Sequence, residues 1–121
     1  RDLAPEDSLV WFNLANARAM QGNGKAADEA YRKALAIQPR FADAYLNYAA
    51  FLMRAGKDAA ALDWLQTARA EGVQDPDIEA ELGVLLLKSG DVEGAMAGFR
   101  RALELNPFAE APRRALEMLR K

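Results

Sequence analysis

Carboxylates alternate along one short stretch of the chain, at Asp77, Glu79 and Glu81. Two carboxylates held side by side can act as general acid and base, or can bind a divalent cation. The chain contains no His and no Cys, which removes the imidazole base, the thiolate nucleophile and the usual zinc ligands. No second cluster of such residues accompanies the three carboxylates. We therefore expect no catalytic site, no metal site and no cofactor.

Paired arginines are the second candidate for chemistry, because guanidinium groups bind phosphate. Such pairs occur at residues 100–101 and 113–114. Nucleic-acid surfaces interleave basic residues with stacking aromatic side chains, and none is interleaved here. The net charge of −2 gives no overall attraction to nucleic acid. The segment 22–24 also lacks the strand and the Lys-Ser/Thr ending of a nucleotide loop. We expect no nucleic-acid partner.

The remaining charge is expected to lie on solvated helix surfaces. The chain of 121 residues is 51% hydrophobic and 28% charged, which suits one domain with a modest core. Its charged residues form an acidic run (Glu71, Asp75, Asp77, Glu79, Glu81, Asp91, Glu93) and a basic C-terminal run (Arg100, Arg101, Arg113, Arg114, Arg120, Lys121).

A fixed period positions all of these residues. Glycines recur every 34 residues, at 22, 56 and 90, and two sets of alanines follow the same period at 27, 61 and 95 and at 34, 68 and 102. Two prolines, at 39 and 107, lie two periods apart. Such a period indicates a stacked array of helical units, and the stretch 11–39 reads as two amphipathic helices joined by a Gly-rich turn.

The units resemble the tetratricopeptide repeat (TPR) family over residues 8–107. That family places a large aromatic residue and a small residue in the first helix, a Gly turn, small and aromatic residues in the second helix, and a closing Pro. The matching residues are Trp11, Leu14, Ala15, Gly22, Ala27, Tyr31, Ala34 and Pro39; Tyr45, Tyr48, Ala49, Gly56, Ala61, Leu65 and Ala68; and Leu82, Gly83, Gly90, Ala95, Phe99, Ala102 and Pro107.

The resemblance implies an all-α fold: a right-handed superhelix of three helix-turn-helix units plus a capping helix. We expect one domain over residues 1–121, with units at 8–41, 42–75 and 76–109 and the capping helix at about 109–120, outside the repeat. The expected helices run at 8–21, 24–37, 41–54, 58–70, 76–88, 92–105 and 109–120. Asp7 or Ser8 is expected to cap the first.

The junction between the second and third units departs from the family pattern. Val73 stands where the closing Pro belongs, and Gly72 and Pro76 can end one helix and begin the next in its place. Glu79 replaces the aromatic residue of the first helix, so looser contact with the preceding helix is expected there. Trp64 is expected to be half exposed on the outer face and to pack against the helix at 76–88, or else to mark a second contact surface.

First helices line the inner surface of TPR arrays, so the resemblance implies a concave partner-binding wall. The wall residues would be Leu9, Phe12, Asn13, Asn16 and Met20; Asp43, Leu46, Asn47, Ala50 and Met53; and Asp77, Ala80, Glu81, Val84 and Leu87. The apolar members would anchor a partner peptide or helix, the asparagines would hold its backbone, and the acidic margin favours a nearby Lys or Arg.

One subclass of the family binds chaperone C-termini through a clamp of Lys, Arg and Asn. Asn16 and Asn47 occupy the two amide positions here. The basic positions carry Phe12, Asp77 and Glu81, and two carboxylates would repel a terminal carboxylate. We therefore expect no chaperone clamp.

The leading hypothesis is a non-catalytic scaffold or adaptor domain with a protein or peptide partner. Two alternatives stay open: a module that forms a homodimer through the same strip, and a regulatory or substrate-presenting domain of a larger enzyme or envelope-assembly factor. No apolar run is long enough to span a bilayer. Because the chain begins at Arg1, we expect a piece of a longer protein. The compartment stays open, with the cytoplasm slightly favoured over a periplasmic or membrane-anchored location.

Overall fold

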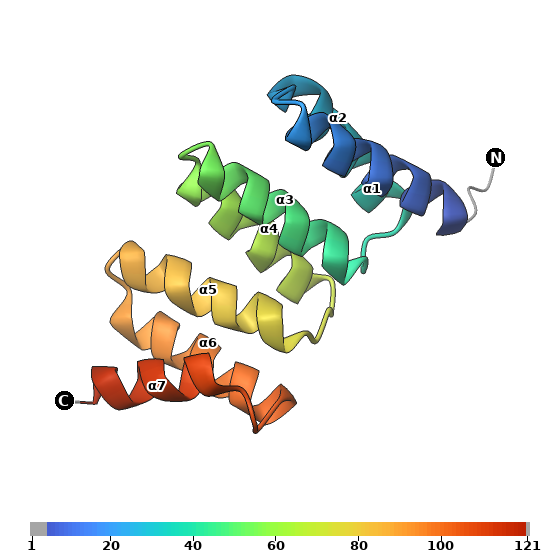
Figure 1. The fold of residues 1–121 in the computed structure, drawn as a ribbon. Helices are drawn as coiled ribbons and strands as arrows, with labels where there is room; N and C mark the ends of the chain where they lie inside the picture. The colour runs from blue at the N-terminus through green and yellow to red at the C-terminus, as the bar shows by residue number, and fades with distance from the viewer. Residues whose placement is uncertain (1–4, 121) are drawn as a thin grey trace.

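The computed structural model of the chain describes residues 5–120, and all regular structure in that range is helical. The helices are α1 (Pro5–Met20), α2 (Gly24–Ile37), α3 (Ala42–Arg54), α4 (Asp58–Ala70), α5 (Pro76–Lys88), α6 (Val92–Leu105) and α7 (Glu110–Leu119). They form successive antiparallel pairs that stack along the chain (Figure 1). The expected all-α class is confirmed.

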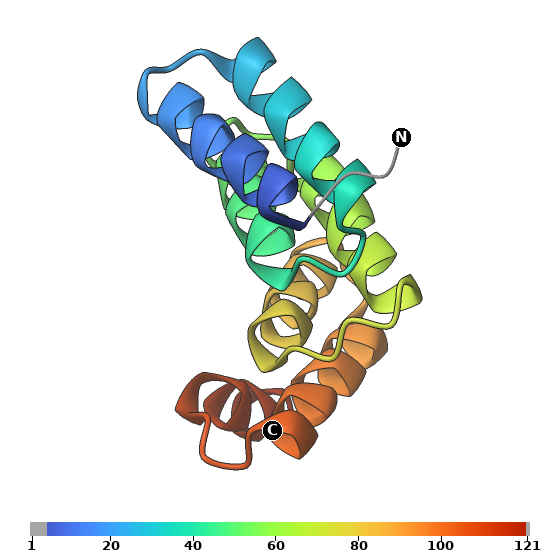
Figure 2. The same cartoon turned by 90° about the vertical axis from the view of Figure 1, so that its right-hand side faces the viewer.

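The first helices of the pairs lie on one side of the molecule and the second helices on the other. In Figure 2, α1, α3, α5 and α7 follow the side that curves inward, whereas α2, α4 and α6 follow the outer side. This arrangement places residues one period apart beside one another on neighbouring helices. A row of side chains with a spacing of 34 residues therefore becomes a row across the curved wall.

Local sequence accounts for most helix ends. The side chains of Asn23, Asp75 and Asp91 accept backbone N–H bonds at the starts of α2, α5 and α6. Pro76 occupies the first turn of α5, and Gly72 follows the end of α4 with φ of 87°. The expected replacement for a closing Pro at this junction is thus confirmed.

The first helix begins earlier than expected, at Pro5 rather than Ser8. Asp7 and Ser8 lie within α1, so the prediction that either one caps it is wrong. Ser8 is instead fully buried, and its hydroxyl donates to the Gln38 side-chain oxygen at 2.5 Å. A contact over 30 residues, and not a local cap, therefore explains this polar side chain.

The last helix follows the period of the repeat. Helices α3, α5 and α7 begin at 42, 76 and 110, each 34 residues after the previous one. Leu116 of α7 packs with Leu86 and Phe99, one and two helices back in the chain. The expectation that this helix lies outside the repeat is therefore wrong, because α7 occupies the position of a fourth first helix.

Small residues let the paired helices approach closely. Ala15, Ala27 and Ala61 are completely buried in the core. At Gly83 a Cβ atom would lie only 2.6 Å from the Phe99 ring, so α5 and α6 could not keep this separation with any larger residue. Tyr31 and Tyr48 fill the space between the first two units, with stacked rings 5.0 Å apart.

Candidate functional site

The predicted wall residues divide into an exposed set and a half-buried set. Leu9, Asn13, Met20, Asp43, Asn47, Asp77, Val84 and Leu87 are exposed, whereas Phe12, Asn16, Leu46, Met53 and Glu81 are half-buried. Phe12, Leu46 and Met53 pack partly against the core, and the Phe12 ring lies 4.8 Å from the ring of Phe41. These three side chains therefore offer only part of their surface to a ligand.

A hydrogen-bonded group joins the first two units at the wall. The Asn16 side-chain oxygen accepts from the Tyr31 hydroxyl at 2.5 Å and from the Asn47 amide at 3.1 Å. The structure thus brings together two of the three predicted asparagines. With its oxygen engaged twice, Asn16 directs its own NH₂ group away from both partners. This orientation leaves donors facing outward.

A cleft of about 260 Å³ opens beside this group. It is lined by Asn16, Ala19, Met20, Tyr31, Asn47, Ala50 and Arg54. Burial raises the pKa of Tyr31, and the positive charge of Arg54 acts in the opposite direction. Tyr31 and Arg54 were not among the predicted site residues. The sequence did hold a signal for Arg54, since Met20, Arg54 and Lys88 follow the 34-residue period at the ends of three first helices.

The predicted acidic margin lies on α5. Asp77 is exposed, and Glu81 is half-buried. Burial raises the pKa of the Glu81 carboxyl, the charge of Lys88 lowers it, and the neighbouring Asp77 raises it. The opposite signs at Arg54 and at Asp77 with Glu81 give the wall a positive end at α3 and a negative end at α5.

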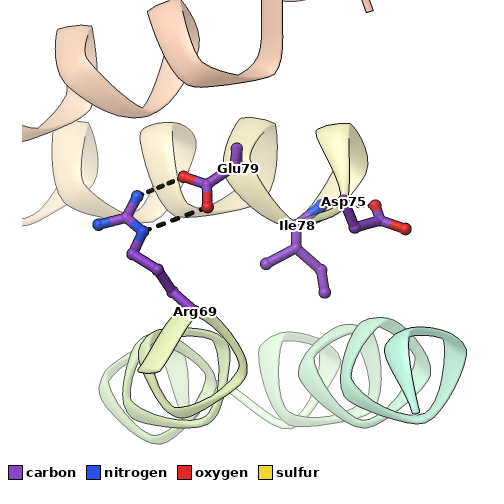
Figure 3. Close-up of polar contacts among 4 residues, drawn as sticks. All are labelled: Arg69, Asp75, Ile78 and Glu79. Atoms are coloured by element: carbon purple, nitrogen blue, oxygen red, sulfur yellow. Dashed lines mark hydrogen bonds and ion pairs between the residues drawn. The ribbon is translucent and has the colours of Figure 1, made fainter. Parts of the chain in front are cut away.

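Glu79 does not belong to that margin. It is only 2% exposed, and it receives two hydrogen bonds from Arg69 of α4, one of them from Nε to Oε2 at 3.2 Å (Figure 3). The expectation of a solvated carboxylate here is wrong, because an ion pair replaces hydration. The expected looser contact is also wrong, since the pair ties α5 to α4.

A larger cleft of about 420 Å³ lies next to the Arg69–Glu79 pair. Its lining includes the α4–α5 loop and α6, through Arg69, Gly72, Val73, Gln74, Glu79, Arg101, Glu104 and Leu105. The period places Tyr45 one unit before Glu79. The Tyr45 hydroxyl donates to the Pro39 carbonyl at 2.7 Å, whereas the shorter Glu79 leaves room at the equivalent place.

Trp64 is half-buried and packs within its own unit. Its ring lies 5.1 Å from that of Tyr48 and 6.4 Å from that of Tyr45, with the Arg32 guanidinium 5.6 Å from its centre. The rings that it contacts belong to α3. The prediction that Trp64 packs against α5 is therefore wrong in its partner.

Two kinds of feature were sought within residues 5–120. No group of three or more acidic side chains there is placed to hold a metal ion. No helix in this range is both long and apolar enough to cross a membrane.

Comparisons with known proteins identify the repeat. Tetratricopeptide repeat models match residues 18–80 and 80–108. Human protein O-mannosyl-transferase TMTC3 is 31% identical over 107 residues, which cover 87% of this chain and 12% of that protein. A *Caenorhabditis elegans* tetratricopeptide repeat-containing protein, trd-1, is 25% identical over 105 residues, covering 87% of this chain and 14% of its own. The chain thus spans about one-eighth of these relatives.

Solved structures show the same fold. The first TPR domain of Spaghetti (RPAP3), bound to an HSP90 peptide, has a TM-score of 0.82 and 22% identity, over 98% of this chain and 94% of that one. The *Yersinia enterocolitica* chaperone SycD, in complex with a YopD peptide, has a TM-score of 0.81 and 15% identity, over 99% and 97% of the two chains. With its matched models, its period and its paired helices, the chain belongs to the tetratricopeptide repeat family.

Proposed function

We propose that the chain is a non-catalytic protein-interaction domain that binds a segment of a partner protein on the wall formed by α1, α3 and α5. The observation that carries the proposal is the wall itself, where exposed apolar side chains alternate with amides whose orientation is fixed. Val84 and Leu87 are 39% and 38% exposed, and Met20 is 89% exposed. Large apolar groups at such exposure are favourable to a ligand that covers them.

The polar groups suit a ligand with a peptide backbone. Asn16 offers its NH₂ group, and Asn13 and Asn47 are exposed on the same two helices. Amides provide both donors and acceptors, which is what the N–H and C=O groups of an extended or helical segment require. Two structural neighbours are bound to peptides, which supports the same mode here.

The test is affinity capture from a lysate of the source organism with matched leucine variants. Leu87→Asp places a charge on the wall, and Leu105→Asp places the same charge at an equally exposed position on α6. A protein held by the native chain and by Leu105→Asp, but lost with Leu87→Asp, supports the proposal. Circular dichroism would verify that the three chains have equal helix content.

Other outcomes assign the wall differently. Equal capture by all three chains contradicts the proposal. If none captures a protein, and light scattering gives the native chain alone a mass above one copy, the wall is a homodimer surface instead.

A second candidate is a substrate-presenting domain of a larger enzyme, favoured by the 31% identity to a part of a transferase. Its test begins with the complete gene. Where a catalytic domain accompanies the repeats, Leu87→Asp should raise KM for a protein substrate while kcat stays unchanged, because remote binding is lost without change to the reacting groups.

A further inference from the structure

We infer that the cleft between α1 and α3 binds an acidic side chain inside the partner segment, an inference that rests on the proposed function. The cleft holds about 260 Å³ and lies on the wall, with Asn16 and Asn47 at its centre and Arg54 at its edge. Charge, free donors and position on the wall each point to this occupant.

The charge of the cleft is positive. Arg54 is exposed, and within residues 7–120 its guanidinium has no ion pair with a carboxylate. No Asp or Glu is among the residues that line the cleft. The field of Arg54 extends to the cleft floor, where it lowers the pKa of Tyr31 against the larger effect of burial. An anionic group therefore meets attraction here without a competing carboxylate.

The free hydrogen-bonding groups add specificity for a carboxylate. The Asn16 oxygen is occupied by Tyr31 and Asn47, so the donors left at the cleft include the Asn16 NH₂ group and the Arg54 guanidinium. A carboxylate accepts from two or more donors at once, and a bond to a charged donor is stronger than a neutral one. A Lys or Arg side chain would find repulsion instead.

The position of the cleft favours a side chain over a chain terminus. Proposed anchors lie on both sides of it, with Phe12 on α1 and Val84 and Leu87 on α5. A segment that covers both sides continues past the cleft in both directions, so the carboxylate there is an internal Asp or Glu. Met20 is 89% exposed at the rim, which favours an apolar residue next to the acid.

The experiment selects short random peptides displayed at the N-terminus of a phage coat protein, so that no peptide has a free C-terminal carboxylate. Selection would use the native chain, Arg54→Glu and the control Arg100→Glu, which makes the same charge change at an exposed position on α6. We expect enrichment of Asp or Glu beside an apolar residue on the native and control chains, and its loss on Arg54→Glu.

A selected peptide would then be synthesised with its acid changed from Glu to Gln, or from Asp to Asn. This change should raise Kd roughly three- to tenfold on the native chain and leave Kd nearly unchanged on Arg54→Glu. Amidation of the peptide's C-terminus should leave Kd unchanged. A large effect of amidation, with no effect of the neutralised acid, would overturn the assignment of an internal carboxylate.

The outcomes separate this inference from the proposed function. Peptides that lose affinity on Leu87→Asp yet show no preference for acids would refute the acid cleft and leave the binding wall intact. Failure of the native chain to enrich any peptide would overturn the proposed function, and the cleft assignment with it.

Discussion

Arg69 and Glu79 replace residues of a different kind at the junction of the second and third units. The period places Leu35 and Leu103 at the positions equivalent to Arg69, and Tyr45 at the position equivalent to Glu79. A buried ion pair gives up the hydration of both charges and recovers that energy only while both partners are present. Losing one partner should therefore be worse than replacing both.

The first prediction concerns this pair. Arg69→Leu should lower the free energy of unfolding by about 3 kcal/mol, because it leaves the Glu79 carboxylate buried without a partner. Arg69→Leu combined with Glu79→Tyr should restore stability to the native value or above it. The new ring can enter the adjacent cleft, and its hydroxyl can donate to Val73 as Tyr45 does to Pro39. Urea denaturation would compare the variants, and equal losses for both would contradict the prediction.

The second prediction concerns the Tyr48 hydroxyl, which donates to Asp28 and accepts from Arg32 Nε at 3.3 Å. Burial and the bond to Asp28 raise the pKa of Tyr48 from 10.0 to about 12. The unfolded chain releases this proton first, so the stabilisation is complete below pH 10.0 and is lost as pH rises through about 12. Ultraviolet titration should show a late phenolate that Tyr48→Phe removes. Titration of every tyrosine near the unperturbed value would contradict this.

At the scale of helices, the crossing of α5 and α6 depends on Gly83. The third prediction is that Gly83→Ala destabilises the chain by about 1–3 kcal/mol, since the added Cβ would lie 2.6 Å from the Phe99 ring. Gly24→Ala is the matched control, because a Cβ there meets its nearest neighbour at an ordinary 3.5 Å. Thermal melts would compare the two. A Gly83→Ala melt as high as that of the control would show that Phe99 yields freely.

The same argument applies to the buried alanines of the second helices. Ala27→Leu or Ala61→Leu, at positions with no exposed surface, should destabilise the chain by about 1–3 kcal/mol through overpacking. Ala59→Leu, at an exposed position of α4, should have little effect and serves as the control. Unchanged melting temperatures for both buried variants would disprove the crossing assignment.

Sequence predicted the helices best where local chemistry decides their ends. The bounds of α5 and α6 were predicted to the residue, because Pro76, the turn at Gly90 and the Asn106-Pro107 pair act within a few residues of the helix ends. Ser8 misled because a short hydroxyl side chain suits both a cap and a buried contact, and only the fold brings Gln38 to it.

The site shows the same limit. Asn16 and Asn47 could be placed on the wall from their register, but their mutual bond and the contribution of Tyr31 depend on how α1, α2 and α3 pack. Arg54 was within reach, since the period that gave Met20 also gives Arg54. The ion pair was less accessible, because a lone Glu at a core position does not name its partner.

At the scale of the whole molecule, the chain is a stack in which each helix contacts its neighbours and stability spreads by nearest-neighbour coupling. Helix α7 covers the end of this stack through Leu116, which is only 6% exposed. Its other side carries charge, with Arg113, Arg114 and Glu117 exposed. A helix at a repeat position thus presents a polar end to solvent.

The fifth prediction tests this coupling. Leu116→Ala should destabilise the chain by about 2–4 kcal/mol through a cavity, and should speed amide exchange in α6 and α7 far more than in α1 and α2. Hydrogen exchange followed by mass spectrometry would resolve the two ends. Met118→Ala is the control, because that side chain is 74% exposed. A uniform acceleration along the chain would show that the stack unfolds as one unit.

The Arg69–Glu79 contact also encodes the order of the units. A tandem duplication of residues 76–109 would put Leu103 before the copied Glu79, and that carboxylate would be buried with no guanidinium. A duplication of residues 42–75 would keep an arginine before every Glu79. Modules of one fold are therefore not interchangeable here: the array can lengthen by copying its second unit, and copying its third would leave an unsatisfied charge at the new junction.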